Sequence, residues 1–292
     1  MILIPGKQAS TAMIEPVDRP ILAGRQPEIQ AEAGLPHPDW PQLLHDDWDR
    51  WLAAVKAAEN GPDVLVATST GANSLAANVE SMLAVALTLR GARVHTLLCD
   101  ELLPACDQAM SHLLPAARLV DGSLRSQVCR GCFGQADAMY SALGLPHHRY
   151  SDLLTTDERS EARSLAATLP ADSLSTYQWR SLAVGEHALA GALRFFGRGD
   201  LGGEPLAESV LRRYFEASML TTLAMQRLFG MYEFKGACFN HGIYVPHGLI
   251  GEVARRANVP VVNWNAAYRK QTFIFSHGDT YHHTLMREPT AN

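Results

Sequence analysis

The densest group of side chains that could do chemistry lies between residues 240 and 248. This run, Asn240-His241-Gly242-Ile-Tyr244-Val-Pro-His247-Gly248, follows an apolar segment at 236–240 that is typical of a buried strand. Imidazole titrates near neutral pH, so His241 is the first candidate for a base that removes a proton from an attacking hydroxyl. Asn240, Gly242, Tyr244 and His247 would position the substrate. The alternative is that the histidines cap the following helix or form local hydrogen bonds.

A second polar segment connects a predicted strand at 63–68 to a predicted helix at 74–90. It contains Thr68, Ser69, Thr70, Gly71 and Asn73. Free amides at a helix N-terminus can hold an anion or sugar hydroxyls, although the serine and threonine side chains here also serve as ordinary N-caps. Neither a G-x-G-x-x-G nor a G-x-x-x-x-G-K-[ST] motif is present, which argues against a dinucleotide site or a P-loop.

Two further groups follow other predicted strands. Asp100 comes directly after a predicted strand at 93–99 and is the second candidate for the base. Near the C-terminus, Tyr268-Arg269-Lys270 precedes a run from Ser276 to His283 that contains His277, His282 and His283. Arg269 could meet a phosphate, and the histidines could line a cleft or be solvated. Adjacent histidines on a strand point to opposite faces, so they suit a metal poorly.

Four of the five cysteines fall into two pairs, Cys99 with Cys106 and Cys129 with Cys132. The second pair has the C-x-x-C spacing of many zinc sites, while the first gap is wide for a zinc knuckle. The four thiols could close a structural zinc site, or they could be reduced and partly buried. Five cysteines are too few for a disulfide scaffold at this chain length.

The elements that must position these groups indicate an α/β fold. A strand, a small-residue loop, a helix and a second strand over 63–99 form a βαβ unit, and a similar unit covers 236–264. We predict a Rossmann-like parallel sheet flanked by helices at 61–292, with helical segments near 158–169, 175–196 and 204–230. Residues 1–60 form a predicted N-terminal helical leader with an amphipathic helix at 39–59. Its tryptophans anchor it to the core or, alternatively, form a sugar or lipid platform.

The composition limits which class of protein, which partners and which cellular location we expect. Of 292 residues, 47% are hydrophobic and 19% are charged, which predicts a globular chain with a net charge of −5. This balance argues against nucleic acid as a partner, although a local basic patch could touch an anionic lipid. No secretory signal and no apolar run of membrane-spanning length is present. We expect a cytoplasmic location, with contact at the inner face of the membrane as an option.

Several of these segments together resemble a known family. Val64-Leu-Val-Ala-Thr-Ser-Thr-Gly71, Leu89-Arg-Gly-Ala-Arg-Val94 and Leu97-Leu-Cys-Asp100 are similar to the N-terminal half of GT-B glycosyltransferases. The run from Phe239 to Ala254, with Asn263-Trp-Asn265 and Tyr268-Arg-Lys270, resembles bacterial capsule and surface-polysaccharide biosynthesis proteins. The resemblance covers residues 61 to 288.

This resemblance implies transfer of a sugar from a nucleotide sugar to a cell-surface polysaccharide or glycolipid. The chain would hold the acceptor, while the nucleotide sugar would bind a domain that the chain does not contain. Such transfer generally needs no metal, so zinc on the cysteines would be structural. Two alternatives remain open: a non-catalytic module that binds a glycan or a protein partner, and a metal-dependent enzyme that uses the cysteines.

Overall fold

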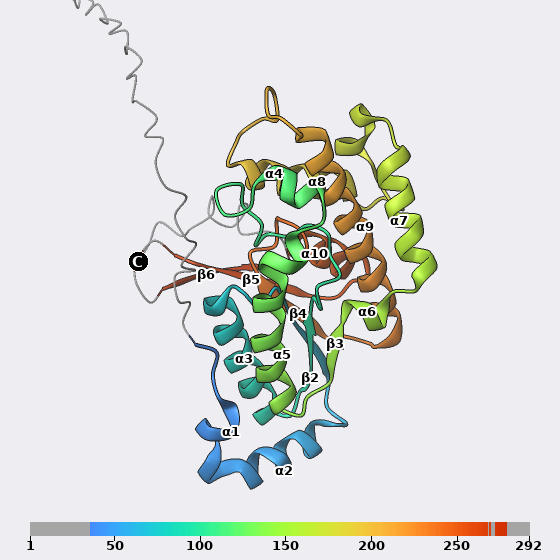
Figure 1. Ribbon diagram of the computed structural model, residues 1–292. Helices are drawn as coiled ribbons and strands as arrows, with labels where there is room; N and C mark the ends of the chain where they lie inside the picture. Colours follow the sequence, from blue (N-terminus) through green and yellow to red (C-terminus); the bar gives the residue numbers. More distant parts are fainter. Residues whose placement is uncertain (1–35, 268, 270–271, 279–292) are drawn as a thin grey trace, which may run out of the picture. The chain divides into compact units, whose positions relative to one another are not determined.

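A computed structural model describes residues 36–267, 269 and 272–278. Its centre is a six-stranded sheet in the order β3-β2-β1-β4-β5-β6 (Figure 1). All neighbouring strands are parallel except β5 and β6, which are antiparallel. The strands are β1 (Asp63–Ser69), β2 (Arg93–Leu98), β3 (His147–Arg149), β4 (Gly236–Asn240), β5 (Val261–Ala266) and β6 (Phe273–His277). The predicted α/β fold with a Rossmann-like, mostly parallel sheet flanked by helices is confirmed.

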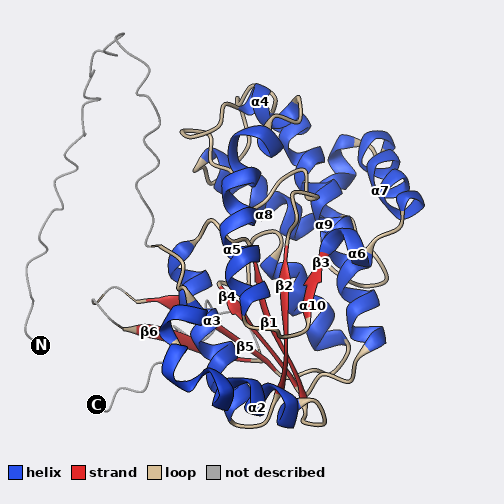
Figure 2. Cartoon of the chain, turned by 60° about the horizontal axis from the view of Figure 1, so that its bottom comes forward, coloured by secondary structure: helices blue, strands red, loops and turns tan. Residues whose placement is uncertain are grey.

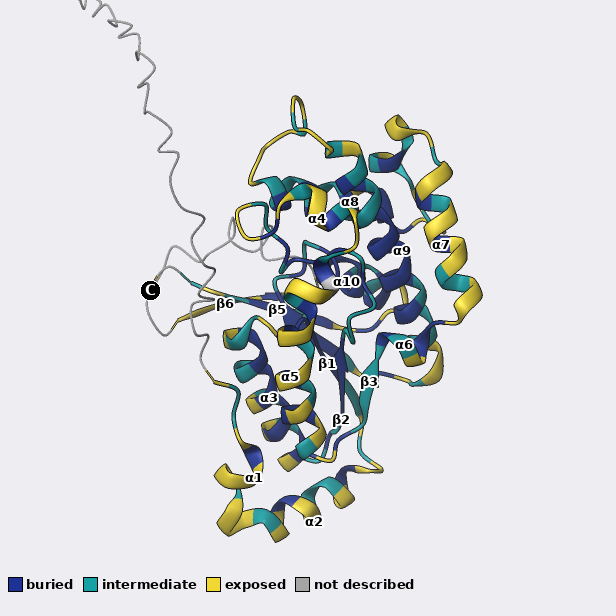
Figure 3. Cartoon of the chain, in the orientation of Figure 1, coloured by how far each residue is buried: buried dark blue, intermediate teal, exposed yellow. Residues whose placement is uncertain are grey.

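Helices cover both faces of the sheet (Figure 2). Alternate residues of the strands face the two layers, because side chains in a strand point to opposite sides. Val66, Val94 and Leu98 pack with α1 (Trp40–Leu43), α2 (Trp48–Ala58), α3 (Ser74–Leu89) and α5 (Arg130–Ala142). Leu65, Ala67 and Leu97 face the opposite layer, which contains α6 (Tyr150–Leu153), α7 (Thr156–Thr168), α8 (Val184–Phe196), α9 (Ala207–Met231) and α10 (His247–Arg256). Figure 3 shows the buried strands between these two layers.

The predicted βαβ units are present with nearly the expected bounds. The first is β1–α3–β2 and the second is β4–α10–β5. The helix predicted at 175–196 is shorter, because a 3₁₀ turn at Ala171–Thr176 precedes α8. The segment from 143 to 148 leads into β3, a short edge strand of polar residues that pattern alone does not reveal.

The predicted leader helix is broken into α1, a 3₁₀ turn at His45–Asp47, and α2. Trp40 and Trp51 are buried, and the Trp51 indole donates a hydrogen bond to the carbonyl of Leu143 over 3.1 Å. These two tryptophans therefore pack into the core. The division at residue 60 stays a prediction. No helix among the described residues is long and apolar enough to cross a membrane.

Candidate functional site

The carboxyl ends of β1 and β4 meet at the point where the strand order reverses. From β1 the chain continues to β2 and β3 on one side, and later strands extend the sheet on the other. Open α/β sheets bind ligands in the crevice outside such a switch point. β1 ends at Ser69 and β4 ends at Asn240, so both polar segments singled out in the sequence lie at this edge.

Ser69 has an unusual backbone at the end of β1. Its φ is 55°, in the left-handed region that residues with a side chain adopt rarely. Its side chain is completely buried, and Oγ lies 3.4 Å from the hydroxyl of Tyr150. The Ser69 carbonyl accepts a hydrogen bond from the amide of Cys99 over 2.8 Å, which ties the end of β1 to the end of β2. The tertiary structure therefore holds a hydroxyl on a sharp turn between a strand and a helix.

Hydrogen bonds fix the residue before Ser69 from both sides. The Thr68 hydroxyl lies 2.5 Å from the hydroxyl of Tyr140 on α5. The Thr68 carbonyl accepts a hydrogen bond from Nε2 of His247 over 2.9 Å. Because a carbonyl only accepts, Nε2 of His247 carries a proton. The other ring nitrogen, Nδ1, lies 3.7 Å from a carboxylate oxygen of Asp107. His247 is thus a buried link between α10 and the end of β1.

A buried carboxyl group lies on the face of the sheet opposite to His247. Glu80, on α3, is fully buried, and its Oε1 accepts a hydrogen bond from the indole of Trp264 over 3.1 Å. Burial raises the pKa of Glu80, while hydrogen bonding by Thr68 and the charge of His247 lower it by less. The hydroxyl of Tyr140 also has a raised pKa, chiefly because it is buried. These groups form a polar network beneath the sheet edge.

The loop after Ser69 is packed against α5. Asn73 caps α3 by accepting a hydrogen bond from the amide of Ala76 over 3.2 Å, a role that the sequence suggested only for the serine and threonine residues. The Ala72 amide points to the sulfur of Cys132 at 3.2 Å. A Cβ on Gly71 would lie 2.3 Å from the carbonyl oxygen of Cys132, so only glycine allows this close approach.

The structure does not assemble the four cysteines into the zinc site that the sequence left open as one of two options. In the part of the chain that the structure describes, no group of three or more histidine, cysteine or acidic residues is placed to hold a metal ion. Burial raises the pKa of the Cys99 thiol to about 12 and that of the Cys132 thiol to about 11. Burial also raises the pKa of Cys106. The Cys106 and Cys132 thiols are buried, the Cys99 thiol is partly buried, and Cys132 packs behind the loop.

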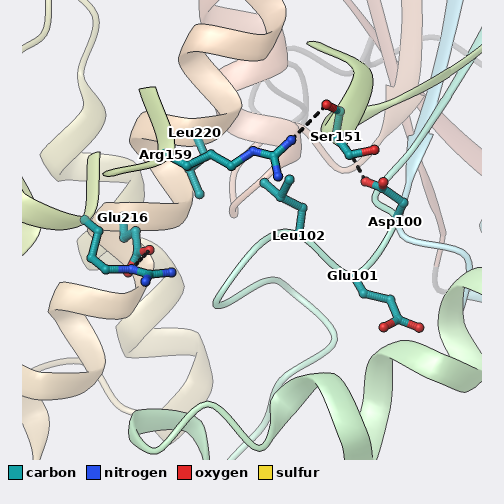
Figure 4. A pocket seen from close by; sticks show the side chains of 8 residues that line it. Asp100, Glu101, Leu102, Ser151, Arg159, Glu216 and Leu220 are labelled. Carbon is teal, nitrogen blue, oxygen red and sulfur yellow. Dashed lines mark hydrogen bonds and ion pairs between the residues drawn. The ribbon is translucent and has the colours of Figure 1, made fainter. Parts of the chain in front are cut away.

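A cavity of about 230 Å³ lies between the segment after β2 and helices α6, α7 and α9 (Figure 4). Asp100 and Ser151 stand at one end, where Asp100 accepts a hydrogen bond from the Ser151 amide over 3.1 Å. Arg159 and Arg163 reach the cavity from α7, and Glu216 reaches it from α9. Glu216 pairs with Arg163 at 3.3 Å, and Arg159 donates to the carbonyl of Ser151 over 2.9 Å. The wall also includes Glu101, Leu102 and Leu220.

The two predicted bases are held apart. Asp100 follows β2 and His241 follows β4, with β1 between them, which places their backbones about 10 Å apart. His241 itself has a φ of 72°, and its ring centre lies 4.8 Å from that of Tyr244. Asp100 and His241 are thus alternative candidates on different sides of β1, and their roles stay predictions.

The remaining predicted binding residues have varied surroundings. Asn240 donates a hydrogen bond from its side chain to the carbonyl of Trp264 over 3.0 Å, which is a structural contact between β4 and β5. Gly242 has a φ of 81°. Tyr244 lies under the guanidinium of Arg194, with 5.1 Å between the guanidinium carbon and the ring centre. Arg269 lies in the β5–β6 connection, two strands from β1. Asp279, His282 and His283 lie outside the described residues.

Sequence reasoning missed three residues of this network. Tyr150 follows β3, and that strand has no apolar alternation to reveal it. Glu80 is the only charged residue of α3, and its place in an otherwise uncharged helix was the available signal. Asp107 lies in the long segment after β2, where no pattern predicted a contact with His247.

Comparisons with known proteins give little sequence-level similarity. No protein-family model and no curated protein matches the chain. Among solved structures, the crystal structure of cyclo(L-leucyl-L-phenylalanyl) synthase matches with 14% identity and a TM-score of 0.33. The match covers 78% of this chain and 95% of that one.

The resemblance to GT-B glycosyltransferases is corrected by this comparison. The matched solved chain is a synthase of a cyclic dipeptide, so the predicted sugar transfer to a polysaccharide or glycolipid is wrong. The physical reason is that the motifs behind it were a βαβ unit and small-residue loops at strand ends, which many Rossmann-like sheets share. The predicted glycan and sugar-nucleotide partners, the exclusion of nucleic acid and the membrane contact are not tested by these comparisons.

Proposed function

We propose that the protein is an acyltransferase that forms a covalent ester on Ser69 and passes the acyl group to an amine. The single observation that carries this proposal is the left-handed backbone of Ser69 between a strand and a helix, with Oγ held beside a second hydroxyl. A sharp strand-to-helix turn presents the nucleophile in many acyl-transfer enzymes. Strain of this kind persists where the surrounding structure maintains it for a function.

Tyr150 is the group that would assist Ser69. Burial raises its pKa, so the phenol keeps its proton and acts as a hydrogen-bond donor rather than a base. The proposed acyl donor is an already activated ester. The Ser69 oxygen attacks the carbonyl of an ester, and the departing alkoxide takes the serine proton. An amine then attacks the Ser69 ester, the amide forms, and the serine oxygen recovers a proton from that amine.

The neighbouring cavity supports an aminoacyl group as the donor. Its lining residues Asp100 and Ser151 directly follow Cys99 and Tyr150, which both contact Ser69. Asp100 and Glu101 supply carboxylates at this end of the cavity, and an ammonium group would offset their charge. Burial of Ser69 also keeps water from the ester intermediate. Formation of a cyclic dipeptide belongs to this reaction class, but the proposal rests on Ser69 and not on the distant structural match.

Intact-protein mass spectrometry tests the intermediate. The full chain is mixed with a panel of activated aminoacyl esters, and the mass of the protein is measured after rapid acid quench. We expect a mass increase equal to one aminoacyl group, which hydroxylamine removes. Ser69→Ala abolishes the adduct, whereas Ser81→Ala, at another fully buried serine, retains it.

The role of Tyr150 has its own measurement. Tyr150→Phe keeps the ring in the core but removes the donor, and we expect acylation to slow by about 10²–10³-fold, as for loss of one donor to a developing oxyanion. An adduct that survives Ser69→Ala, or no adduct with any ester of the panel, would overturn the proposal.

A further inference from the structure

Helix α3 carries an apolar stripe on the side that faces away from the sheet. Leu75, Met82 and Leu89 have exposed fractions of 41%, 57% and 58%. Val79 is partly buried and Ala86 is exposed, and they complete the series. The spacing alternates between four and three residues, which is the repeat of a helix that packs along another helix. The stripe is about 21 Å long at 1.5 Å per residue.

α3 has unusually few charged residues for a helix at the protein surface. Its only charged residue is Glu80, and that side chain is buried against Trp264. Among the described positions of α3, none that reaches solvent carries a charge. A surface helix ordinarily has a charged outer face, and a helix that is apolar around its circumference is ordinarily buried. The outer face of α3 therefore has the composition of a contact surface.

We propose that this face is the interface of a homodimer, in which α3 packs antiparallel against α3 of a second copy. The stripe is nearly symmetric about Met82. A two-fold axis at this residue therefore places Met82 against Met82 of the second chain, and Leu75 opposite Leu89 of that chain. Val79 then meets Ala86, a larger side chain against a smaller one. Spacing of this kind gives nearly aligned helices, and the antiparallel direction also places opposite helix dipole ends together.

The absence of charged residues on the α3 stripe favours a second copy of the chain as the partner that packs on it. In a two-fold interface, a residue at the axis meets itself, so a charge there would face a like charge. The uncharged stripe avoids that repulsion. A membrane-surface helix would instead carry lysine or arginine beside its apolar face, and α3 has neither along its length.

The apolar surface continues from α3 onto the edge of the sheet. α3 packs on Trp264 of β5 through Val79 and Leu83. Phe275 of β6 is in register with Trp264, and it is 53% exposed. Phe273, on the same face two residues away, is 39% exposed and lies edge-on to Trp264. These aromatic rings extend the surface beyond a single helix, as a stable interface requires.

Light scattering coupled to size-exclusion chromatography tests the assembly with the full chain. We expect a dimer at micromolar concentration that Met82→Glu converts to a folded monomer, as checked by circular dichroism. Met231→Glu is the matched control, because Met231 is also a helical methionine and is 55% exposed. A monomeric wild type overturns the proposal, including a monomer that binds lipid vesicles through Met82. Equal effects of both substitutions also overturn it.

Cysteine cross-linking tests the direction of packing without depending on a disruptive charge. Met82→Cys should form a disulfide-linked dimer under mild oxidation, while Met231→Cys should not. Leu75→Cys alone should not cross-link, but a mixture of Leu75→Cys and Leu89→Cys chains should form a mixed dimer. Cross-linking of Leu75→Cys to itself without Met82→Cys dimers would refute the antiparallel arrangement.

Discussion

A chain of hydrogen-bonded histidines on β2 and β3 predicts loss of stability in mild acid. Nε2 of His95 lies 2.8 Å from a carboxylate oxygen of Asp63 and donates its proton to it. Nδ1 of His95 then accepts the proton that His148 carries on Nε2, over 2.9 Å. Burial, together with the smaller electrostatic effects of His95, His147 and Arg93, lowers the pKa of His148 to about 4.

The direction and size of the stability loss follow from the number of protons bound by the folded chain and by the unfolded chain. Between pH 6.5 and about 4, the unfolded chain binds a proton at His148 and the folded chain does not, so stability falls as the pH falls. Integration of this difference gives a loss of about 2 kcal/mol between pH 7 and pH 5 from His148 alone. Burial also lowers the pKa of His95 and His147, so they add to the loss in the same direction.

Urea denaturation at several pH values measures this contribution. We expect the free energy of unfolding to decrease from pH 7 to pH 5 more steeply for the wild type than for His148→Gln, by about 2 kcal/mol. His45→Gln is the control, because the His45 side chain is exposed. The comparison uses slopes, so a lower absolute stability of His148→Gln does not affect it. Parallel slopes for the wild type and His148→Gln would refute the assignment.

Three other predictions concern the packing around the site. Gly71→Ala places a Cβ against the Cys132 carbonyl and should destabilise the fold by about 1–3 kcal/mol in thermal unfolding. Gly134→Ala is the control: its Cβ would enter open space, so we expect no change or a slight gain in stability. Trp51→Ala removes a buried indole and its bond to Leu143, so we expect a loss of about 3–5 kcal/mol in chemical denaturation. The Cys132 thiol, with a pKa of about 11, should react with a thiol reagent only after unfolding; native-state labelling that Cys132→Ser reduces by one equivalent would contradict this.

Local pattern was sufficient for the central elements. Apolar runs and helical periodicity predicted β1, α3 and β2 with nearly the right bounds, because burial on both faces leaves a strong signal in a parallel strand. The same reasoning placed the 68–73 and 240–248 segments at the carboxyl edge of the sheet, where the structure has them. It failed for β3, since an edge strand made of His147, His148 and Arg149 has no apolar alternation.

The candidate site needed contacts between distant parts of the chain. Ser69 was identified as a binding residue from its loop, but its left-handed backbone and its contact with Tyr150 arise from packing across 81 positions. The bases chosen from sequence, Asp100 and His241, are separated by β1, which only the strand order reveals.

The sequence by itself determined the α/β class, the two βαβ units and the edge of the sheet that collects polar side chains, since these follow from local periodicity. Only the tertiary structure decided which of those side chains meet. The cysteines illustrate the difference: their spacing allowed either a zinc site or reduced thiols, and the fold places Cys132 as a buried thiol behind Gly71, because α5 packs on the loop there. Spacing along a chain limits which groups can meet, and the packing of helices on the sheet selects among them.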